Sequence, residues 1–217
     1  MDSKEYIARR IARMFLSGSL VNLGAGLPAM VVKYLPENVN VTLHAENGIV
    51  GSMPLPPLAE PKPYEIDAGG APCGVKAGAA IVDSATSFGL IRGGHLDATV
   101  LGAMQVDEEG SLANWIVPGG KFTGMGGAMD LVAGAKKVIA ATEHCSKDGT
   151  PKILKRCSYP LTGYRVVDLI VTELAVIEVT PKGLVLKETA PGVTVEEVME
   201  KTGARLCVDL CAAVMSA

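Results

Sequence analysis

The spacing of apolar side chains changes along the chain, and each spacing predicts a different kind of element. Apolar residues recur every three to four positions across residues 4–16, which predicts a first helix with Ser3 as its cap. Short runs of apolar, often β-branched residues at 20–23 and 39–45 predict two strands. Between these strands, a glycine-rich turn leads to Pro28, which suits the first position of a second helix.

The middle of the chain is rich in proline and glycine. The prolines from Met53 to Pro63 exclude regular structure there, and glycines with short polar runs extend the predicted loop to about Gly78. A regular alternation then resumes, with strands predicted at 99–106, 111–116, 137–142, 169–172, 176–179 and 184–187 and helices at 128–135 and 194–202. This mixture predicts an α/β fold in a single domain over residues 1–217, with helices on both faces of a sheet.

Composition and charge exclude several classes of protein. Hydrophobic residues make up 48% of the chain and aromatic residues only 4%, so aliphatic side chains must fill the core. The net charge of −3 gives no electrostatic reason to expect a nucleic acid or a membrane surface as partner. No apolar run approaches the ~18 residues that cross a bilayer, and the amino-terminal segment lacks the apolar core of a secretory signal.

The cysteines favour a cytoplasmic protein without a metal centre. Their number is odd and their spacing is wide, and they do not form the paired spacing of a zinc site: Cys73, Cys145, Cys157, Cys207 and Cys211. Reduced thiols in a cytoplasmic protein are the simplest account of this pattern.

Glu46 is the most informative single residue. It follows the apolar strand that ends at Ala45, and Asn47-Gly48 then supplies a turn, because both residue types tolerate positive φ. At the carboxyl end of a strand in an open α/β sheet, a side chain faces the crevice where ligands bind, and a carboxylate there can act as a nucleophile, a base or a metal ligand. The alternative is an acidic turn residue beside a hairpin-type Asn-Gly.

Two glycine-rich segments are further candidates for ligand contact. Gly24 and Gly26 follow a strand and open a helix, a context that suits phosphate binding, although the full dinucleotide fingerprint is missing. Gly126 and Gly127 precede the helix predicted at 128–135, where bare backbone N–H groups can approach a substrate oxygen. In both segments the alternative is structural: a tight turn in the first, and dense packing of helix against strand in the second.

Two histidines have both functional and structural interpretations. His44 shares a strand face with Glu46, where it either orients the carboxylate or is buried against the sheet; we favour burial. His144 and Cys145 follow a strand, but no third partner completes a Cys–His catalytic arrangement.

Segments that span almost the whole chain carry one further pattern: Leu20–Pro28, Ala45–Gly51, Phe88–Asp97, Leu101–Asp107, Ala113–Gly119, Gly126–Leu131 and Ile170–Glu173. Together they closely resemble the B (beta) subunit of class I, 3-oxoacid-type CoA-transferases. That family usually has serine before the glutamate, whereas this chain has Ala45, so a hydroxyl near the carboxylate is lost. The resemblance implies an open, mostly parallel sheet covered by helices.

The resemblance also implies a mechanism. Glu46 is the covalent nucleophile, which carries CoA as a glutamyl thioester, and Gly127 supplies a backbone N–H to the oxyanion. Further residues are expected to contact CoA or substrate: Gly24, Gly26, Asn47, Gly48 and Gly126. Coenzyme A is then a substrate, and no cofactor or metal is required. A separate alpha subunit, which carries much of the CoA-binding surface, is the expected partner. The expected substrates are a short-chain acyl-CoA and a carboxylic acid.

Two other functions compete with this interpretation. One is a non-catalytic binding subunit on the same fold, which would not need Glu46. The other is a sugar-phosphate isomerase or sensor, since the fold is shared with such proteins; clustered basic residues would support it, and the sequence shows none.

Overall fold

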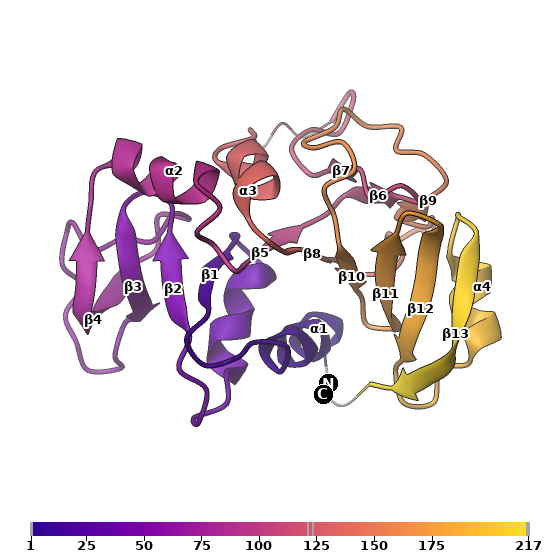
Figure 1. Ribbon diagram of the computed structural model, residues 1–217, viewed down its shortest axis with the longest axis horizontal. Coiled ribbons are helices and arrows are strands. Elements are labelled where there is room, and N and C mark those ends of the chain that lie inside the picture. The colour runs from indigo at the N-terminus through magenta and orange to yellow at the C-terminus, as the bar shows by residue number, and fades with distance from the viewer. Residues whose placement is uncertain (1, 121, 123, 216–217) are drawn as a thin grey trace.

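The computed structural model describes residues 2–120, 122 and 124–215, and a ten-stranded sheet forms its centre (Figure 1). In spatial order the sheet runs through β13 (Leu206–Val214), β12 (Gly183–Thr189), β11 (Ala175–Thr180), β10 (Leu169–Val171), β8 (Val138–Ala141), β5 (Ala98–Gly102), β1 (Leu20–Leu23), β2 (Thr42–Ala45), β3 (Ile49–Pro54) and β4 (Cys73–Ile81). A smaller sheet contains β7 (Leu112–Ala113), β6 (Gln105–Asp107) and β9 (Ile153–Leu154).

The middle of the large sheet is parallel. Neighbours among β10, β8, β5, β1 and β2 all run in the same direction. Antiparallel strands flank this part, β3 and β4 beside β2 and β11 and β12 beside β10, while β13 pairs with β12 in parallel. The predicted open, mostly parallel sheet is confirmed, and the carboxyl ends of its central strands meet along one edge, where α/β proteins bind ligands.

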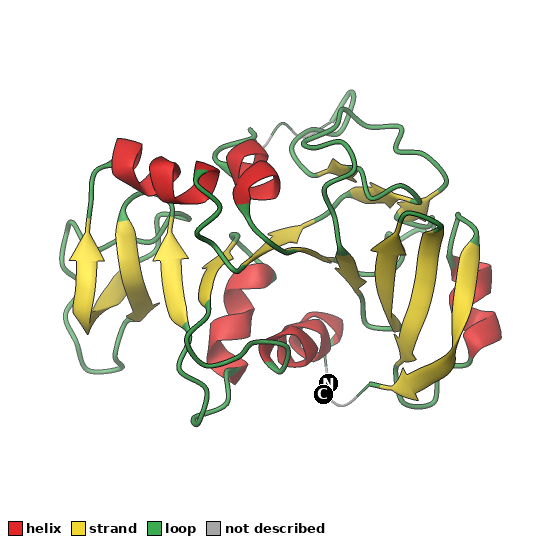
Figure 2. Cartoon of the chain, viewed as in Figure 1, coloured by secondary structure: helices red, strands yellow, loops and turns green. Residues whose placement is uncertain are grey.

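Helices cover both faces of the central strands (Figure 2). The helices are α1 (Ser3–Ala12), the 3₁₀ helix η1 (Pro28–Tyr34), α2 (Ser84–Arg92), α3 (Ala128–Gly134) and α4 (Val195–Lys201). In the view of Figure 1, α2 and α3 lie above the central strands and α1 lies below them. None of the helices in the described part of the chain is long and apolar enough to cross a membrane.

Alternating side chains on the central strands divide the interior into two cores. In β8, Val138 and Ala140 belong to the core that includes α2 and α3, whereas Ile139 and Ala141 belong to the core that includes α1. Side chains of a strand point alternately to opposite faces, so an apolar residue at every position is what a strand covered on both sides requires.

Several predicted elements need correction. The helix predicted at 4–16 ends at Ala12, and Ser3 is its first residue rather than its cap, which is Asp2. The strand predicted at 39–45 begins only at Thr42. The proline-rich loop is shorter than predicted, because Met53 and Pro54 end β3 and the glycine-rich stretch from Cys73 forms β4.

The strand predicted at 99–106 is two strands in different sheets. Between the two strands, side chains rather than a neighbouring strand hydrogen-bond to the backbone carbonyls. Asn114 Nδ2 donates to Gly102 O at 3.1 Å, and Thr142 Oγ1 donates to Ala103 O at 2.9 Å. The chain then turns into β6, which forms the predicted hairpin with β7.

Candidate active site

Glu46 begins the turn between β2 and β3, which pair antiparallel with Ala45 opposite Ile49. It therefore belongs to a hairpin and also stands at the carboxyl end of β2, a strand parallel to β1. The turn is fixed from both sides, because Gly48 N–H donates to Ala45 O and Val82 N–H donates to Gly48 O, each at 2.9 Å. Glu46 is thus both an acidic residue of a hairpin turn and a residue at the end of a strand where ligands can bind, so the two interpretations of the sequence are compatible.

Gly48 allows two pieces of backbone to approach closely. Its φ is +129°, and an added Cβ would lie 2.2 Å from the carbonyl oxygen of Val82. Both of its backbone hydrogen-bonding groups are occupied within the protein. The structure thus gives Gly48 a clear role in shaping the turn, and its predicted contact with a ligand stays a prediction.

Replacing Gly48 by alanine is expected to lower the free energy of unfolding by about 2 kcal/mol or more, because the new methyl group clashes and the positive φ is strained. Urea unfolding measures this. Gly18→Ala is the matched control: Gly18 also has positive φ, +89°, but its Cβ would have no neighbour within 4 Å. Equal losses in the two variants would show that the contact with Val82 contributes nothing.

Gly127 lies directly against the side chain of Glu46. A Cβ on Gly127 would be 3.1 Å from Cγ of Glu46 and 3.1 Å from Cζ of Phe88. Gly127 has an ordinary φ of −82°, so space rather than backbone conformation explains the glycine here. It stands just before α3, where the first N–H groups of a helix have no partner within the helix. The fold therefore brings together the two residues predicted to be catalytic, while their chemical roles stay predictions.

Phe88 is a site residue that the sequence analysis did not single out. It lies on α2, which was not predicted, and its ring contacts the same space as Glu46 and Gly127. An ion pair holds α2 beside α3: Arg92 Nε donates to Asp130 Oδ1 at 2.7 Å, and the Arg92 guanidinium lies 5.6 Å from the centre of the Phe88 ring. These contacts fix the aromatic wall of the site.

Burial changes the chemistry of Glu46. Its side chain is half-buried, and burial raises the pKa of its carboxyl above the ordinary value; the negative charge of Asp67 adds to this rise. A carboxylate with a raised pKa holds its electrons less tightly and attacks carbon more readily once it is ionised.

A cavity of about 280 Å³ adjoins the turn, since Ala45 forms part of its wall. Gly24 and Gly26 both line it, as do Ala45, Asp67 and Cys73. Gly24 is closely packed, since its N–H donates to Val100 O at 2.8 Å and an added Cβ would lie 3.1 Å from that oxygen. Gly26 has a φ of +78° and open space around it.

The other predicted contact residues have different surroundings. Asn47 is exposed, and its Nδ2 donates to Ile66 O at 2.9 Å, which ties the Glu46 turn to the loop between β3 and β4. Gly126 has a φ of +52° and no neighbour within 4 Å of an added Cβ. Within the described residues, no group of three or more His, Cys, Asp or Glu side chains is placed to hold a metal ion.

His44 is buried in a chain of polar side chains that crosses the sheet. Its Nε2 lies 2.9 Å from Ser87 Oγ, and Asn22 Nδ2 donates to its carbonyl oxygen at 3.0 Å. Burial lowers the pKa of His44, which favours the neutral form of the ring. The preference for a buried His44 is confirmed.

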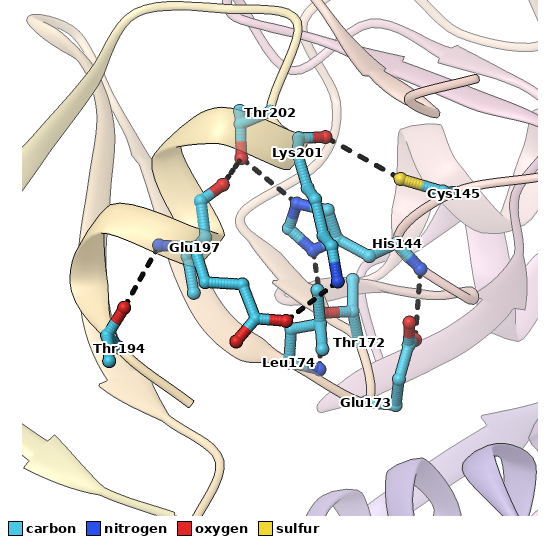
Figure 3. A network of polar contacts seen from close by, with 10 residues as sticks. His144, Cys145, Thr172, Glu173, Leu174, Thr194, Glu197, Lys201 and Thr202 are labelled. Atoms are coloured by element: carbon cyan, nitrogen blue, oxygen red, sulfur yellow. Dashed lines mark hydrogen bonds and ion pairs between the residues drawn. The ribbon is translucent and has the colours of Figure 1, made fainter. Parts of the chain in front are cut away.

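His144 is enclosed in a second polar network, far along the chain from Glu46 (Figure 3). The Thr202 hydroxyl donates to Val198 O at 2.6 Å, so its oxygen accepts the proton of His144 Nε2 at 3.0 Å. The Thr172 hydroxyl then donates to Nδ1, also at 3.0 Å. Burial, helped by the positive charge of Lys201, lowers the pKa of His144 to about 4.

This network is structural. The ring of His144 faces two threonines, while Cys145 Sγ contacts the carbonyl oxygen of Lys201 at 3.7 Å (Figure 3). The two side chains therefore do not form the nucleophile–base pair of a cysteine hydrolase.

Comparison with known proteins agrees with the geometry. Residues 4–201 match the family model described as coenzyme A transferase. The chain is 55% identical to the acetate CoA-transferase subunit beta of Escherichia coli K12, over 94% of each chain. It is 45% identical to the human mitochondrial succinyl-CoA:3-ketoacid coenzyme A transferase 2, over 95% of this chain and 40% of that protein.

A solved structure shows the same fold at low sequence identity. The acyl-CoA transferase apoenzyme of Escherichia coli O157:H7 superposes with a TM-score of 0.81 and 23% identity, over 99% of this chain and 43% of that chain. With the match of the family model and the identity to curated relatives, this chain belongs to the coenzyme A transferase family.

Proposed function

We propose that this chain is the catalytic beta subunit of an enzyme that moves CoA between a short-chain acyl-CoA and a carboxylic acid. The observation that carries the proposal is the half-buried carboxylate of Glu46 at the carboxyl end of β2, in contact with Gly127 and bounded by Phe88. A relative that is 55% identical is an acetate CoA-transferase subunit beta, which supports small monocarboxylic acids as substrates. A binding subunit without catalysis would not need Glu46 in this position, and the sequence lacks the clustered basic residues that would support a sugar-phosphate isomerase.

The proposed reaction has two halves. A carboxylate oxygen of Glu46 attacks the thioester carbon, the C–S bond breaks, and CoA leaves as the thiolate from a mixed anhydride. The thiolate then attacks the side-chain carbonyl of Glu46, and the acid departs as a carboxylate with the anhydride oxygen. An acceptor acid reverses both steps. No cofactor or metal takes part in this scheme, because an ionised carboxylate is the nucleophile and CoA is itself a substrate.

Gly127 is proposed to stabilise the negative oxygen that forms in each attack. Gly127 precedes α3, and its Cβ position lies 3.1 Å from Cγ of Glu46, which supports a role for its N–H near the acyl carbon. A hydrogen-bond donor fixed in this way needs no reorganisation when charge develops.

The active form is proposed to contain an alpha subunit as well. The bacterial relative carries the name subunit beta, and the family resemblance leads us to propose an assembly of α2β2 or larger. We further propose a cytoplasmic location, supported by the free thiols of Cys73, Cys145, Cys157 and Cys207.

Purified alone, the chain is expected to show no CoA transfer, because half of the CoA-binding surface is missing. Addition of the alpha subunit is expected to restore transfer, with a maximum at equal amounts of the two chains. Transfer from labelled acetyl-CoA to a second acid measures the activity, and light scattering measures the mass of the assembly. Full activity of a preparation free of alpha chains would contradict the proposal.

A further inference from the structure

Asp67 stands on the wall of the cavity beside the Glu46 turn. It is half-buried, and its Oδ1 accepts hydrogen bonds from Gly69 N–H at 2.8 Å and Ala71 N–H at 2.9 Å. These bonds fold the loop between β3 and β4 around the carboxylate. The same loop reaches across the cavity, since an added Cβ on Gly69 would lie 3.6 Å from Cβ of Ala25.

The cavity wall is mostly apolar, and although His44 and Ser52 also line it, Asp67 is its one carboxylate within the described residues. Most of the wall is formed by apolar side chains, namely those of Leu23, Ala29, Val32, Leu43, Met53 and Pro54. The lining residues in the described part of the chain include neither lysine nor arginine. Nothing on the wall therefore neutralises the charge of Asp67. The charge reaches the nearby groups, because it adds to the effect of burial in raising the pKa of both Glu46 and Cys73.

The cavity also lies next to the Glu46 turn. Ala45, the neighbour of Glu46, forms part of its wall, and Asn47 on the other side of Glu46 is bonded to Ile66, the neighbour of Asp67. A volume of about 280 Å³ lies near the lower end of the range for ligand pockets, which suits an acyl chain of a few carbon atoms.

We infer that this cavity takes the hydrocarbon end of the acyl group, and that Asp67 sets specificity by disfavouring acids with a second carboxylate. The inference rests on the proposed reaction at Glu46 and adds the cavity and the residue that select the acid. A monocarboxylic acid of two to four carbons leaves only apolar atoms in the cavity. A dicarboxylic acid places a second negative charge beside Asp67, and like charges placed together in an interface oppose binding strongly.

The test compares Asp67→Asn with the wild-type complex of both subunits. Asparagine keeps Oδ1 as an acceptor for the two loop N–H groups, so the loop is expected to keep its fold while the charge is lost. With acetyl-CoA as donor, the ratio of kcat/KM for succinate to kcat/KM for butyrate is expected to rise about tenfold or more. Glu60→Gln is the control, since it removes an exposed charge from the same loop without touching the cavity wall.

The pH profile supplies a readout that a purely structural role would not move. Activity needs ionised Glu46 and falls as pH falls through its raised pKa. Removing the charge of Asp67 lowers that pKa, so the acid limb of the Asp67→Asn profile is expected to shift to lower pH.

A second variant tests the place of the hydrocarbon chain. Ala29→Leu narrows the cavity and is expected to lower kcat/KM for butyrate several-fold more than kcat/KM for acetate.

The outcomes distinguish a failure of the proposed CoA transfer from a failure of the proposed role of Asp67. A wild-type complex without any transfer would contradict the proposed function itself. Wild-type transfer with a succinate-to-butyrate ratio that changes less than about twofold in Asp67→Asn, or equally in Glu60→Gln, would overturn the role of Asp67 alone. Equal losses for acetate and butyrate in Ala29→Leu would remove the acyl group from the cavity.

Discussion

Replacing Gly127 by valine is expected to reduce turnover by about 10²- to 10³-fold, the loss typical of removing one oxyanion donor or displacing a reacting group by about 1 Å. The first atom of the new side chain would already lie 3.1 Å from both Glu46 Cγ and Phe88 Cζ, and valine adds two more methyl groups beyond it. Glu46 then moves, or the acyl group no longer reaches it. Steady-state turnover of the assembled enzyme measures the effect.

Two further variants sharpen this prediction. Gly127→Ala adds only the first atom, to which a flexible carboxylate side chain can adjust, so a smaller loss is expected. Gly89→Ala is the matched control on α2, because an added Cβ there has no neighbour within 4 Å and alanine favours a helix by up to about 1 kcal/mol over glycine. Near-normal turnover of a folded, assembled Gly127→Val enzyme would exclude Gly127 from the site.

The elements found from the sequence are those whose apolar pattern is complete. Strands such as β8 are apolar at every position because both faces are covered, and α3 follows a clear glycine break. The residue proposed as nucleophile could also be found from the sequence, because the charged Glu46 directly follows an apolar strand.

The elements that were missed depend on contacts distant in sequence. β4 contains Gly74, which packs so closely on β3 that an added Cβ would lie 3.0 Å from Met53 Cγ, and such glycines resemble a loop when the partner strand is unknown. α2 buries only Ser87 and Ile91, so its helical periodicity is too sparse to recognise. Its clearest signal is local, the side chain of Asp83 accepting a hydrogen bond from Thr86 N–H at 2.7 Å.

The missed site residues follow from the missed elements. Phe88 reaches Glu46 only because α2 packs beside α3, and Asp67 reaches the cavity only because its loop folds back over the Gly24–Gly26 turn. Neither contact produces a recognisable spacing of residues in the sequence. A hydrogen-bonded Asp-x-Gly loop is a local signal for Asp67, but it indicates a turn and says nothing about the charge beside the cavity.

Glu46→Ala is expected to abolish transfer while the protein folds and assembles normally. The carboxylate is the group proposed to carry CoA, so its loss removes the covalent step rather than weakening it. Burial raises the pKa of Glu46, which means that the ionised form is less favourable in the folded chain than in the unfolded one at neutral pH. Removing it should therefore leave the melting temperature unchanged or slightly raised, as is common where a site is maintained at the expense of stability.

The intermediate gives a chemical test of the same prediction. Incubation of the complex with acyl-CoA and no acceptor should attach CoA to the peptide that contains Glu46, as mass spectrometry of a digest would detect. Borohydride should then reduce the thioester and inactivate the enzyme irreversibly, whereas enzyme kept without acyl-CoA should survive.

Glu46→Asp should be severely impaired, because the shorter side chain withdraws the carboxylate by about 1.5 Å and a displacement of about 1 Å can cost 10²-fold. Glu60→Ala, an exposed acid outside the site, should behave as wild type. An active Glu46→Ala enzyme, or CoA attached to another residue, would refute the proposed nucleophile.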